Sequence, residues 1–393
     1  MNMRNARDKT AIVGIGATEI SRDCGRTELK MATEAILDAV EDAGINVEDI
    51  DGMVNYTMDT AEQIDVVRAL GIPNLSFFSK TPYGGGGSVA TVAHAVAAVE
   101  SGQANYVVAF RSIRDASIPV RIGDFDPNAA SYNESDVYYG MYLPYGHLTP
   151  VSWVAMFAQR YMHEFNVESD AFYPIAKINR ENANRNPSSP FYDRKLTYEE
   201  YVNSPINVTP LRRHDSCLNI DGAMAVIVTT ADRAKHLKQT PAHISGIAQG
   251  MSTNGEVMTS YSRKDITTLH EVSAYGKKMF EMAGVTPKDI DVAQFYDAFS
   301  PLVPMQLEAL GFTKKGESLD FIGDGHNISK DGILPINTSG GLMSEGYVHG
   351  MNLIVEGVRQ IRGTSTTQIN DVELSMVTGG LGVPSSGVIL KRR

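Results

Sequence analysis

Two tyrosines occupy positions at which a side chain can do acid–base chemistry. Tyr296 opens the segment YDAFSP directly after the apolar stretch AQF, which we expect to be a strand. Ligands of α/β sheets bind at the carboxyl ends of strands. Tyr347 lies in SEGYVHG, a glycine-lined turn that enters a helix. A phenol with an ordinary pKa of about 10 is mainly a hydrogen-bond donor at neutral pH. The alternative is that each tyrosine only packs in its loop with its hydroxyl bonded to backbone.

Several neighbours of these tyrosines could support them. His349 is a candidate acid–base group, but residues two apart do not share a helix face, so we expect it to point away from Tyr347. Asp297 either orients Tyr296 or caps the following helix. The run Gly84–Gly87 precedes a helix, where backbone N–H groups can bind a negatively charged oxygen, although glycines also allow tight helix packing. The candidates that line the substrate pocket are Tyr83, Gly85, Gly86, Gly341 and Gly380, with Gly84 as a possible supporting residue.

The chain has two cysteines, Cys24 and Cys217, in no metal-like spacing. We therefore expect no metal site and no disulfide framework, which suits a reducing cytoplasm. Cys217 lies in HDSCLNIDG, which leads into a closing strand and not into a helix. A buried structural cysteine is the expected role.

Composition excludes several classes of protein. The net charge of −11 argues against broad nucleic-acid binding, although a local basic pocket for an acidic cofactor remains open. No apolar run is long enough for a membrane span, and the first residues lack the apolar core of a signal peptide. We expect a soluble, cytoplasmic protein. The arginines that could form a basic pocket are Arg111, Arg114, Arg121, Arg212 and Arg213.

The chain repeats itself once. ATEAILDAVEDAGINVEDIDGMV, which begins at Ala32, matches SAYGKKMFEMAGVTPKDIDVAQF, which begins at Ser273. TAIVGIGA matches AHISGIAQG, and DGAMAVIVTT matches PSSGVILKRR. The glycine loop that begins at Tyr83 matches the one that begins at Thr338, each opening a helix. Four units in the same order indicate an internal duplication.

Each copy alternates strands and helices, which predicts an α/β fold with helices packed on a mostly parallel sheet. We predict strands at 10–17 and 49–57 and helices at 29–43 and 151–165. The predicted halves are residues 1–240 and 241–393. Residues 112–208 form an insertion in the first half that either covers a site or makes a subunit contact.

The motifs FYDAFS, NTSGGLMSEGYVHG and TGGLGVPSSG, together with the duplicated halves, resemble the thiolase superfamily. The closer resemblance is to its sterol-carrier-protein-x or lipid-transfer-protein branch, and within it to the aldolases of bacterial steroid side-chain degradation. This resemblance implies the thiolase fold: duplicated βαβαβαββ halves in a layered α-β-α-β-α architecture with an inserted loop domain.

A working thiolase carries cysteine and histidine at positions that this chain fills otherwise. Alignment of the motifs places the nucleophilic cysteine at Gly84 and the second cysteine near Thr378. The two histidines fall at Tyr296 and Tyr347. A thiol at a helix start would be activated by the helix dipole, so its loss removes the usual acyl-enzyme chemistry. The two phenols remain, and they suit chemistry through an enolate.

The resemblance therefore implies retro-aldol cleavage of a β-hydroxyacyl-CoA, with the hydroxyl on a steroid ring carbon. The products would be a ring ketone and a short acyl-CoA such as propionyl-CoA. It also implies a homodimer core and a small zinc-ribbon/OB-fold partner that carries any zinc, so that this chain needs no cofactor of its own. Two alternatives remain: an acyltransferase with a displaced nucleophile, Cys217 or Cys24, and a non-catalytic acyl-CoA-binding scaffold.

Overall fold

The computed structural model describes residues 7–82, 84–117, 140–147, 149–256, 258–380 and 385–392. The first half contains β1 (Thr10–Ala17), α1 (Glu28–Ala43), β2 (Gly52–Tyr56), α2 (Gln63–Leu70), β3 (Phe77–Thr81), α3 (Ser88–Glu100), β4 (Val107–Arg114), β7 (Asp221–Thr230) and α8 (Ala231–Ala234). The second half contains β8 (Ala242–Gly250), α9 (His270–Ala283), β9 (Val292–Gln294), α10 (Leu302–Ala309), α11 (Ser318–Ile322), α12 (Gly341–Ser344), α13 (Met351–Arg362), β10 (Leu374–Gly379) and β11 (Ser385–Lys391). Residue 240 lies between α8 and β8.

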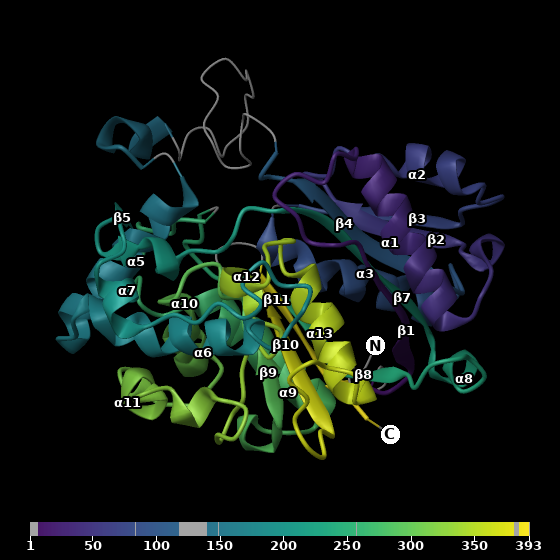
Figure 1. Cartoon of the computed structure of the whole chain (residues 1–393). Coiled ribbons are helices and arrows are strands. Elements are labelled where there is room, and N and C mark those ends of the chain that lie inside the picture. Colours follow the sequence, from purple (N-terminus) through teal and green to yellow (C-terminus); the bar gives the residue numbers. More distant parts are fainter. Residues whose placement is uncertain are drawn as a thin grey trace.

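One nine-stranded mixed sheet runs through both halves in the order β3-β2-β4-β7-β1-β8-β11-β10-β9 (Figure 1). The order is mirrored about the junction of β1 and β8, so β2, β4, β7 and β1 correspond to β9, β10, β11 and β8. In the first half, β3 pairs with β2. At the equivalent place in the second half, only one residue pairs: Ile336 forms a parallel bridge with Ala293 of β9. Both glycine loops therefore follow equivalent chain segments, which agrees with the duplication predicted from sequence.

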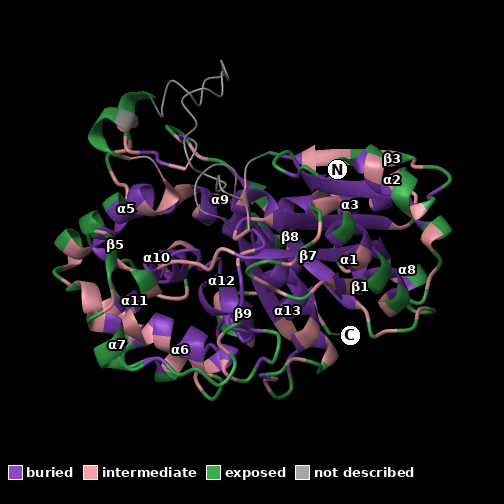
Figure 2. Ribbon diagram, turned by 45° about the horizontal axis from the view of Figure 1, so that its top comes forward, coloured by how far each residue is buried: buried purple, intermediate pink, exposed green. Residues whose placement is uncertain are grey.

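The helices form three layers, and the two halves of the sheet lie between them. α3 and α13 contact strands of both halves and so make up the middle layer. α1 covers the outer face of β1, β4 and β7, and α9 covers the outer face of β8 and β11. Figure 2 shows β1, β7 and β8 as buried, whereas the edge strand β3 is only partly so. The predicted layered α/β fold is confirmed.

The repeated sequence produces the same local geometry twice. Gly44 ends α1 and Gly284 ends α9, both in the left-handed conformation that glycine adopts most easily. The residues that follow form a one-turn helix, in which the carboxylate of Asp49 or Asp289 accepts the backbone N–H of the residue before the turn, Asn46 or Thr286. Each turn delivers the chain into a buried parallel strand, β2 or β9.

The insertion between β4 and β7 contains α5 (Pro150–Phe165), α6 (Tyr173–Ala183), α7 (Tyr198–Val202) and the small hairpin of β5 (Ile206–Val208) and β6 (Leu211–Arg212). The helix predicted at 151–165 is present as α5. The predicted start at residue 112 is wrong, because β4 continues to Arg114 as it pairs with β7. α6 packs against α12, so the insertion contacts the second half. Within the described ranges, no helix has the length and apolar character needed to cross a membrane.

Candidate functional site

The hydroxyls of Tyr296 and Tyr347 lie 2.7 Å apart and share a hydrogen bond. Their rings meet edge to face, with centroids 6.2 Å apart. Tyr296 is buried and Tyr347 is half-buried. The sequence places the two residues in separate loops, and the fold brings their phenolic oxygens into direct contact.

Tyr296 is held by its backbone at the carboxyl end of β9. Its N–H donates to the Thr378 hydroxyl at 2.8 Å, and its carbonyl accepts from the Gln306 side chain at 2.9 Å. The Thr378 hydroxyl in turn donates to Gln306. The preceding Phe295 is fixed on both sides by the Asn337 amide. Thr378, which stands near the expected position of the second thiolase cysteine, therefore positions Tyr296.

Both phenols are held in their neutral form. Burial raises the pKa of Tyr296 well above its ordinary value, and the neighbouring Tyr347 raises it further. Burial also raises the pKa of Tyr347 above the usual range, with added effects from Cys217 and Asp115. At neutral pH the pair consists of two hydrogen-bond donors, either of which can donate to the other.

Cys217 and Asp115 lie close enough to influence the phenols electrostatically. The sequence indicated Cys217 only as the nucleophile of an alternative reaction and did not indicate Asp115. Cys217 donates its backbone N–H to Ala298 at 2.8 Å, which joins the first half to the loop that follows Tyr296. Burial, together with Asp297 and Asp115, raises the pKa of the Cys217 thiol above its usual range. A neutral thiol is a weak nucleophile, so Cys217 is not an activated replacement for the missing cysteine. The Cys24 thiol is hydrogen-bonded to the backbone of Arg26 and does not contact the phenols.

The glycine loop before α3 faces this pair. A Cβ atom at Gly85 would lie 1.8 Å from the Tyr296 hydroxyl oxygen, so only glycine leaves room for the phenol. A Cβ at Gly84 would instead lie 3.1 Å from the His349 ring. The position that points at the phenols is therefore Gly85, and Gly84 lies beside His349. Gly86 packs against Gly380, where a Cβ would meet the Gly86 Cα at 2.1 Å.

Asp297 caps a helix, and its carboxylate does not contact the Tyr296 hydroxyl. It accepts the backbone N–H of Leu342 at 2.8 Å and of Met343 at 3.3 Å, at the start of α12, and the Asn179 amide at 2.7 Å. Burial raises its pKa to about 7. A Cβ at Gly341 would meet this carboxylate at 2.4 Å, so Gly341 makes room for the cap.

The prediction that His349 points away from Tyr347 is wrong. Their ring centroids are 4.7 Å apart in an edge-to-face arrangement. The helix-face argument does not apply, because residues 345–350 form a turn before α13, and His349 has φ of +48°. Arg111 donates to the His349 ring at 2.9 Å and is fully buried, so it does not belong to a surface basic pocket.

Two predicted residues, Tyr83 and Arg121, lie outside the described residues. Within the described part of the chain, no group of three or more His, Cys, Asp or Glu side chains could hold a metal ion.

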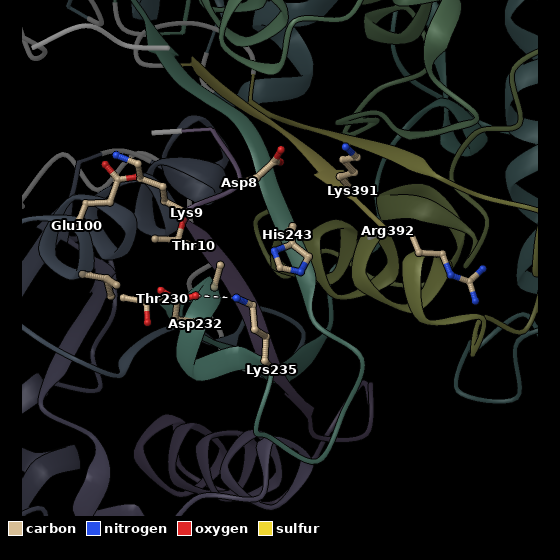
Figure 3. A pocket seen from close by; sticks show the side chains of 12 residues that line it. Asp8, Lys9, Thr10, Glu100, Thr230, Asp232, Lys235, His243, Lys391 and Arg392 are labelled. Atoms are coloured by element: carbon tan, nitrogen blue, oxygen red, sulfur yellow. Dashed lines mark hydrogen bonds and ion pairs between the residues drawn. The ribbon is translucent and has the colours of Figure 1, made fainter. Parts of the chain in front are cut away.

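A separate cavity of about 660 Å³ lies at the other end of α3 (Figure 3). It is lined by Glu100 at the end of that helix, by Thr10 and His243, and by charges of both signs. The phenols face the start of α3, which has 13 residues. At a rise of about 1.5 Å per residue, the helix separates the two places by about 20 Å. This cavity is not part of the phenol site.

Similarity to known proteins agrees with the geometry. The family model for "Thiolase C-terminal domain-like" matches residues 252–392. The 17-hydroxy-3-oxo-4-pregnene-20-carboxyl-CoA lyase of Mycobacterium tuberculosis is 46% identical over 97% of this chain and 99% of its own. The steroid side-chain-cleaving aldolase of Thermomonospora curvata is 46% identical over 97% of each chain. The chain belongs to the thiolase superfamily, in the branch of the steroid side-chain-cleaving aldolases.

A solved structure of this family, the Ltp2-ChsH2(DUF35) aldolase, superposes with a TM-score of 0.94 at 44% sequence identity, over 98% of both chains. The fold and the family expected from the sequence motifs are therefore confirmed. Where a thiolase has its reactive cysteine and two histidines, this chain has a glycine loop and two tyrosines.

Proposed function

We propose that this chain is a carbon–carbon lyase that cleaves a β-hydroxyacyl-CoA by a retro-aldol reaction, with a steroid side-chain thioester as the substrate class. The observation that carries this proposal is the pair of neutral phenols, 2.7 Å apart, that faces Gly85 in a glycine loop that lacks the thiol of a thiolase. The names of the two relatives at 46% identity support the same reaction class and the same class of substrate.

The proposed reaction needs two proton transfers. The β-hydroxyl of the substrate loses its proton, the bond between the α- and β-carbons breaks, and its electron pair forms the enolate of the thioester. The α-carbon then gains a proton, so that a ketone and a shorter acyl-CoA leave. Because both phenols are neutral, one can accept the hydroxyl proton only as it passes its own proton to the other.

This relay uses the observed hydrogen bond as its path. The proton taken from the β-hydroxyl by one phenol is matched by a proton given to the α-carbon by the other, and neither oxygen carries a full charge. Backbone N–H groups of the glycine loop and nearby donors would stabilise the enolate oxygen. Either phenol can meet the β-hydroxyl first, because either oxygen can donate in the pair.

We also propose that the active protein is an assembly. The structural relative is an aldolase of Ltp2 with ChsH2(DUF35), which supports a small partner that completes the acyl-CoA site. Any zinc would belong to that zinc-ribbon partner and not to this chain. For the homodimer core, the free edge of β3 in the first half offers a backbone that can pair, with Phe78 71% exposed on it. We expect the assembly to work in the cytoplasm.

The reaction class is tested with the purified chain and its partner, supplied with a β-hydroxyacyl-CoA that carries the hydroxyl on a ring carbon. The expected result is a ring ketone and a shorter acyl-CoA in equal amounts, without added coenzyme A. A requirement for free coenzyme A would indicate thiolytic acyl transfer and contradict the proposal. Substrate binding without products in the presence of the partner would support a non-catalytic scaffold instead.

A further inference from the structure

A buried ion pair stands next to the phenol site, although neither phenol contacts it directly. Arg111 of β4 is fully buried and donates to the Asp59 carboxylate and to the Ser112 carbonyl. Asp59 also accepts the backbone N–H of Tyr56 at 2.7 Å and of Ser112 at 3.3 Å. A buried ion pair contributes little net stability, because removing both charges from water is costly. Its geometry fixes the direction of the guanidinium.

That guanidinium determines where His349 carries its proton. The Arg111 Nε–H donates to His349 Nδ1 at 2.9 Å. Arginine has no acceptor atom, so Nδ1 must present a lone pair, and the ring proton is on Nε2. Burial, and then the charge of Arg111, lower the pKa of His349 well below its ordinary value. His349 is therefore a neutral imidazole with an N–H at Nε2 and is excluded as the general base.

Nε2 faces the glycine loop of the site. A Cβ at Gly84 would lie 3.1 Å from it, and the glycine leaves that space open. Among the described residues, no hydrogen-bond partner of Nε2 is present. The ring also lies against Tyr347 at 4.7 Å between centroids and is stacked on Tyr56 at 6.0 Å. The Nε2 side of the ring therefore faces the glycine loop at Gly84, and the ring lies against Tyr347.

The backbone of His349 is held in this place against its preference. Its φ of +48° is uncommon for a residue with a side chain and is a strained conformation. The Tyr56 hydroxyl donates to the His349 carbonyl at 3.3 Å, and the Arg111 guanidinium lies 5.4 Å from the Tyr56 ring centroid. Strained residues of this kind cluster at functional sites.

We propose that His349 is a catalytic residue whose Nε2–H donates a hydrogen bond to the thioester oxygen as the enolate forms, and that Arg111 is the positioning residue that keeps the proton on Nε2. This inference rests on the proposed retro-aldol reaction. When the carbon–carbon bond breaks, its electron pair moves into the enolate and negative charge grows on the thioester oxygen. A neutral N–H stabilises that oxygen without transferring its proton, so the proton from the β-hydroxyl still reaches the α-carbon through the phenols.

The first test compares His349→Gln with His349→Leu in the complex with the partner. The glutamine amide can present an N–H near the place of Nε2, and leucine offers similar bulk without a donor. We expect His349→Leu to lower kcat roughly 100- to 1000-fold, as for loss of an oxyanion donor, while Kd for the substrate changes only a few-fold. The kcat of His349→Gln should be at least about tenfold higher than that of His349→Leu. Equal losses in the two variants, or near-normal kcat in His349→Leu, would overturn the role of the donor.

The second test locates the proton by ¹⁵N NMR of histidine-labelled protein, with the His349 signal assigned by its loss in His349→Gln. The titratable and charged groups next to the ring are Arg111, Tyr56 and Tyr347, and Asp59 and Glu28 lie behind it beside Arg111. We expect the ¹⁵N chemical shift of Nδ1 to be that of an unprotonated nitrogen and that of Nε2 to be that of a protonated one, with both unchanged from pH 6 to 8. An imidazolium, or a proton at Nδ1, would refute the inference.

The role of Arg111 is tested in the double variant Arg111→Met/Asp59→Asn, which removes both charges together. The His349 signal should then show a second tautomer with the proton on Nδ1, because no donor holds Nδ1 as an acceptor any longer. An unchanged spectrum would overturn the positioning role, and Asp59→Asn alone is the control that retains Arg111. These spectra need no substrate. A wild-type complex that fails to cleave β-hydroxyacyl-CoA would thus count against the proposed function and leave the Arg111–His349 result standing.

Discussion

The hydroxyls of Tyr296 and Tyr347 form one hydrogen bond between two neutral groups, and this bond is the centre of the chemistry proposed here. A single phenol with a raised pKa is a poor base at neutral pH. Two phenols in contact can move a proton from one side of the pair to the other without forming a phenolate. Gly85 makes that arrangement possible, because any larger residue would occupy the space of the Tyr296 hydroxyl.

Gly85→Ala is expected to lower kcat about 100-fold or more, because the added methyl group displaces the Tyr296 phenol by an ångström or more. The measurement is turnover of the β-hydroxyacyl-CoA. Gly140→Ala is the control, since a Cβ there meets no atom within 4 Å, and its activity should match the wild type. Normal activity in Gly85→Ala would mean that the phenol position is not critical.

Iodoacetamide should leave turnover intact at neutral pH, because the Cys217 thiol has a pKa raised above its usual range and little thiolate is present. Below that pKa the thiolate fraction, and with it the alkylation rate, should rise roughly tenfold per pH unit from pH 7 to 9. Cys217→Ser should retain at least about half of the activity, since serine fills nearly the same volume. Rapid inactivation at pH 7 that Cys217→Ser prevents would favour a displaced nucleophile instead.

The sequence located the two phenols because each lies in a motif with a known place in the fold. The place of Cys217 and Asp115 beside the phenols and the pairing of Arg111 with His349 could not be found in this way. Cys217 comes to the site through a backbone hydrogen bond to Ala298, which is distant in sequence. His349 turns toward Tyr347 only because a left-handed residue replaces the expected helical one. Long-range pairing and single backbone angles are not visible in residue patterns.

At the scale of elements, the site exists where loops of the two halves meet. The glycine loop before α3 meets the loop after β10 through the contact of Gly86 with Gly380. α3 and α13 lie side by side between the two halves of the sheet, so their first residues, Ser88 and Met351, lie near each other at the phenol site. The duplication predicted these two helices, but it did not predict that their loops would interlock through glycine.

Gly380→Ala should destabilise the protein more than Gly363→Ala does. Both residues have positive φ, +71° and +76°, so alanine is strained at each. At Gly363 a Cβ meets nothing within 4 Å, whereas at Gly380 it meets the Gly86 backbone. The difference in free energy of unfolding should be about 1–3 kcal/mol, the usual cost of overpacking, as measured by denaturant titration. Equal values would show that the two loops are not closely packed.

At the scale of the whole molecule, the nine strands join both halves into one sheet, and β3 is its outer edge in the first half. An exposed edge strand with an apolar residue invites pairing with another chain. The family and the layered fold followed from the sequence, because they depend on repeated motifs. The edge proposed for pairing could not be recognised in the same way, because exposure of a residue such as Phe78 depends on which strands neighbour it.

Phe78→Glu should convert a dimer to monomer, because it places a charge on the edge that is proposed to pair. The measurement is sedimentation velocity of the chain, with Ile333→Glu as the control. Ile333 is equally exposed, at 71%, but lies in the second half away from β3. A dimer that survives Phe78→Glu and dissociates with Ile333→Glu would place the interface on the other half.

Single-turnover kinetics of Tyr296→Phe and Tyr347→Phe test the role of the paired phenols most directly. Each substitution removes one hydroxyl and keeps the ring, so fold and partner binding should persist. Tyr106→Phe, which alters a phenol at the start of β4, is the control. The prediction is a loss of at least about 100-fold in the rate of carbon–carbon cleavage in both variants, as for a positioned acid or base, with substrate still bound. Cleavage at the wild-type rate in both variants would contradict the account.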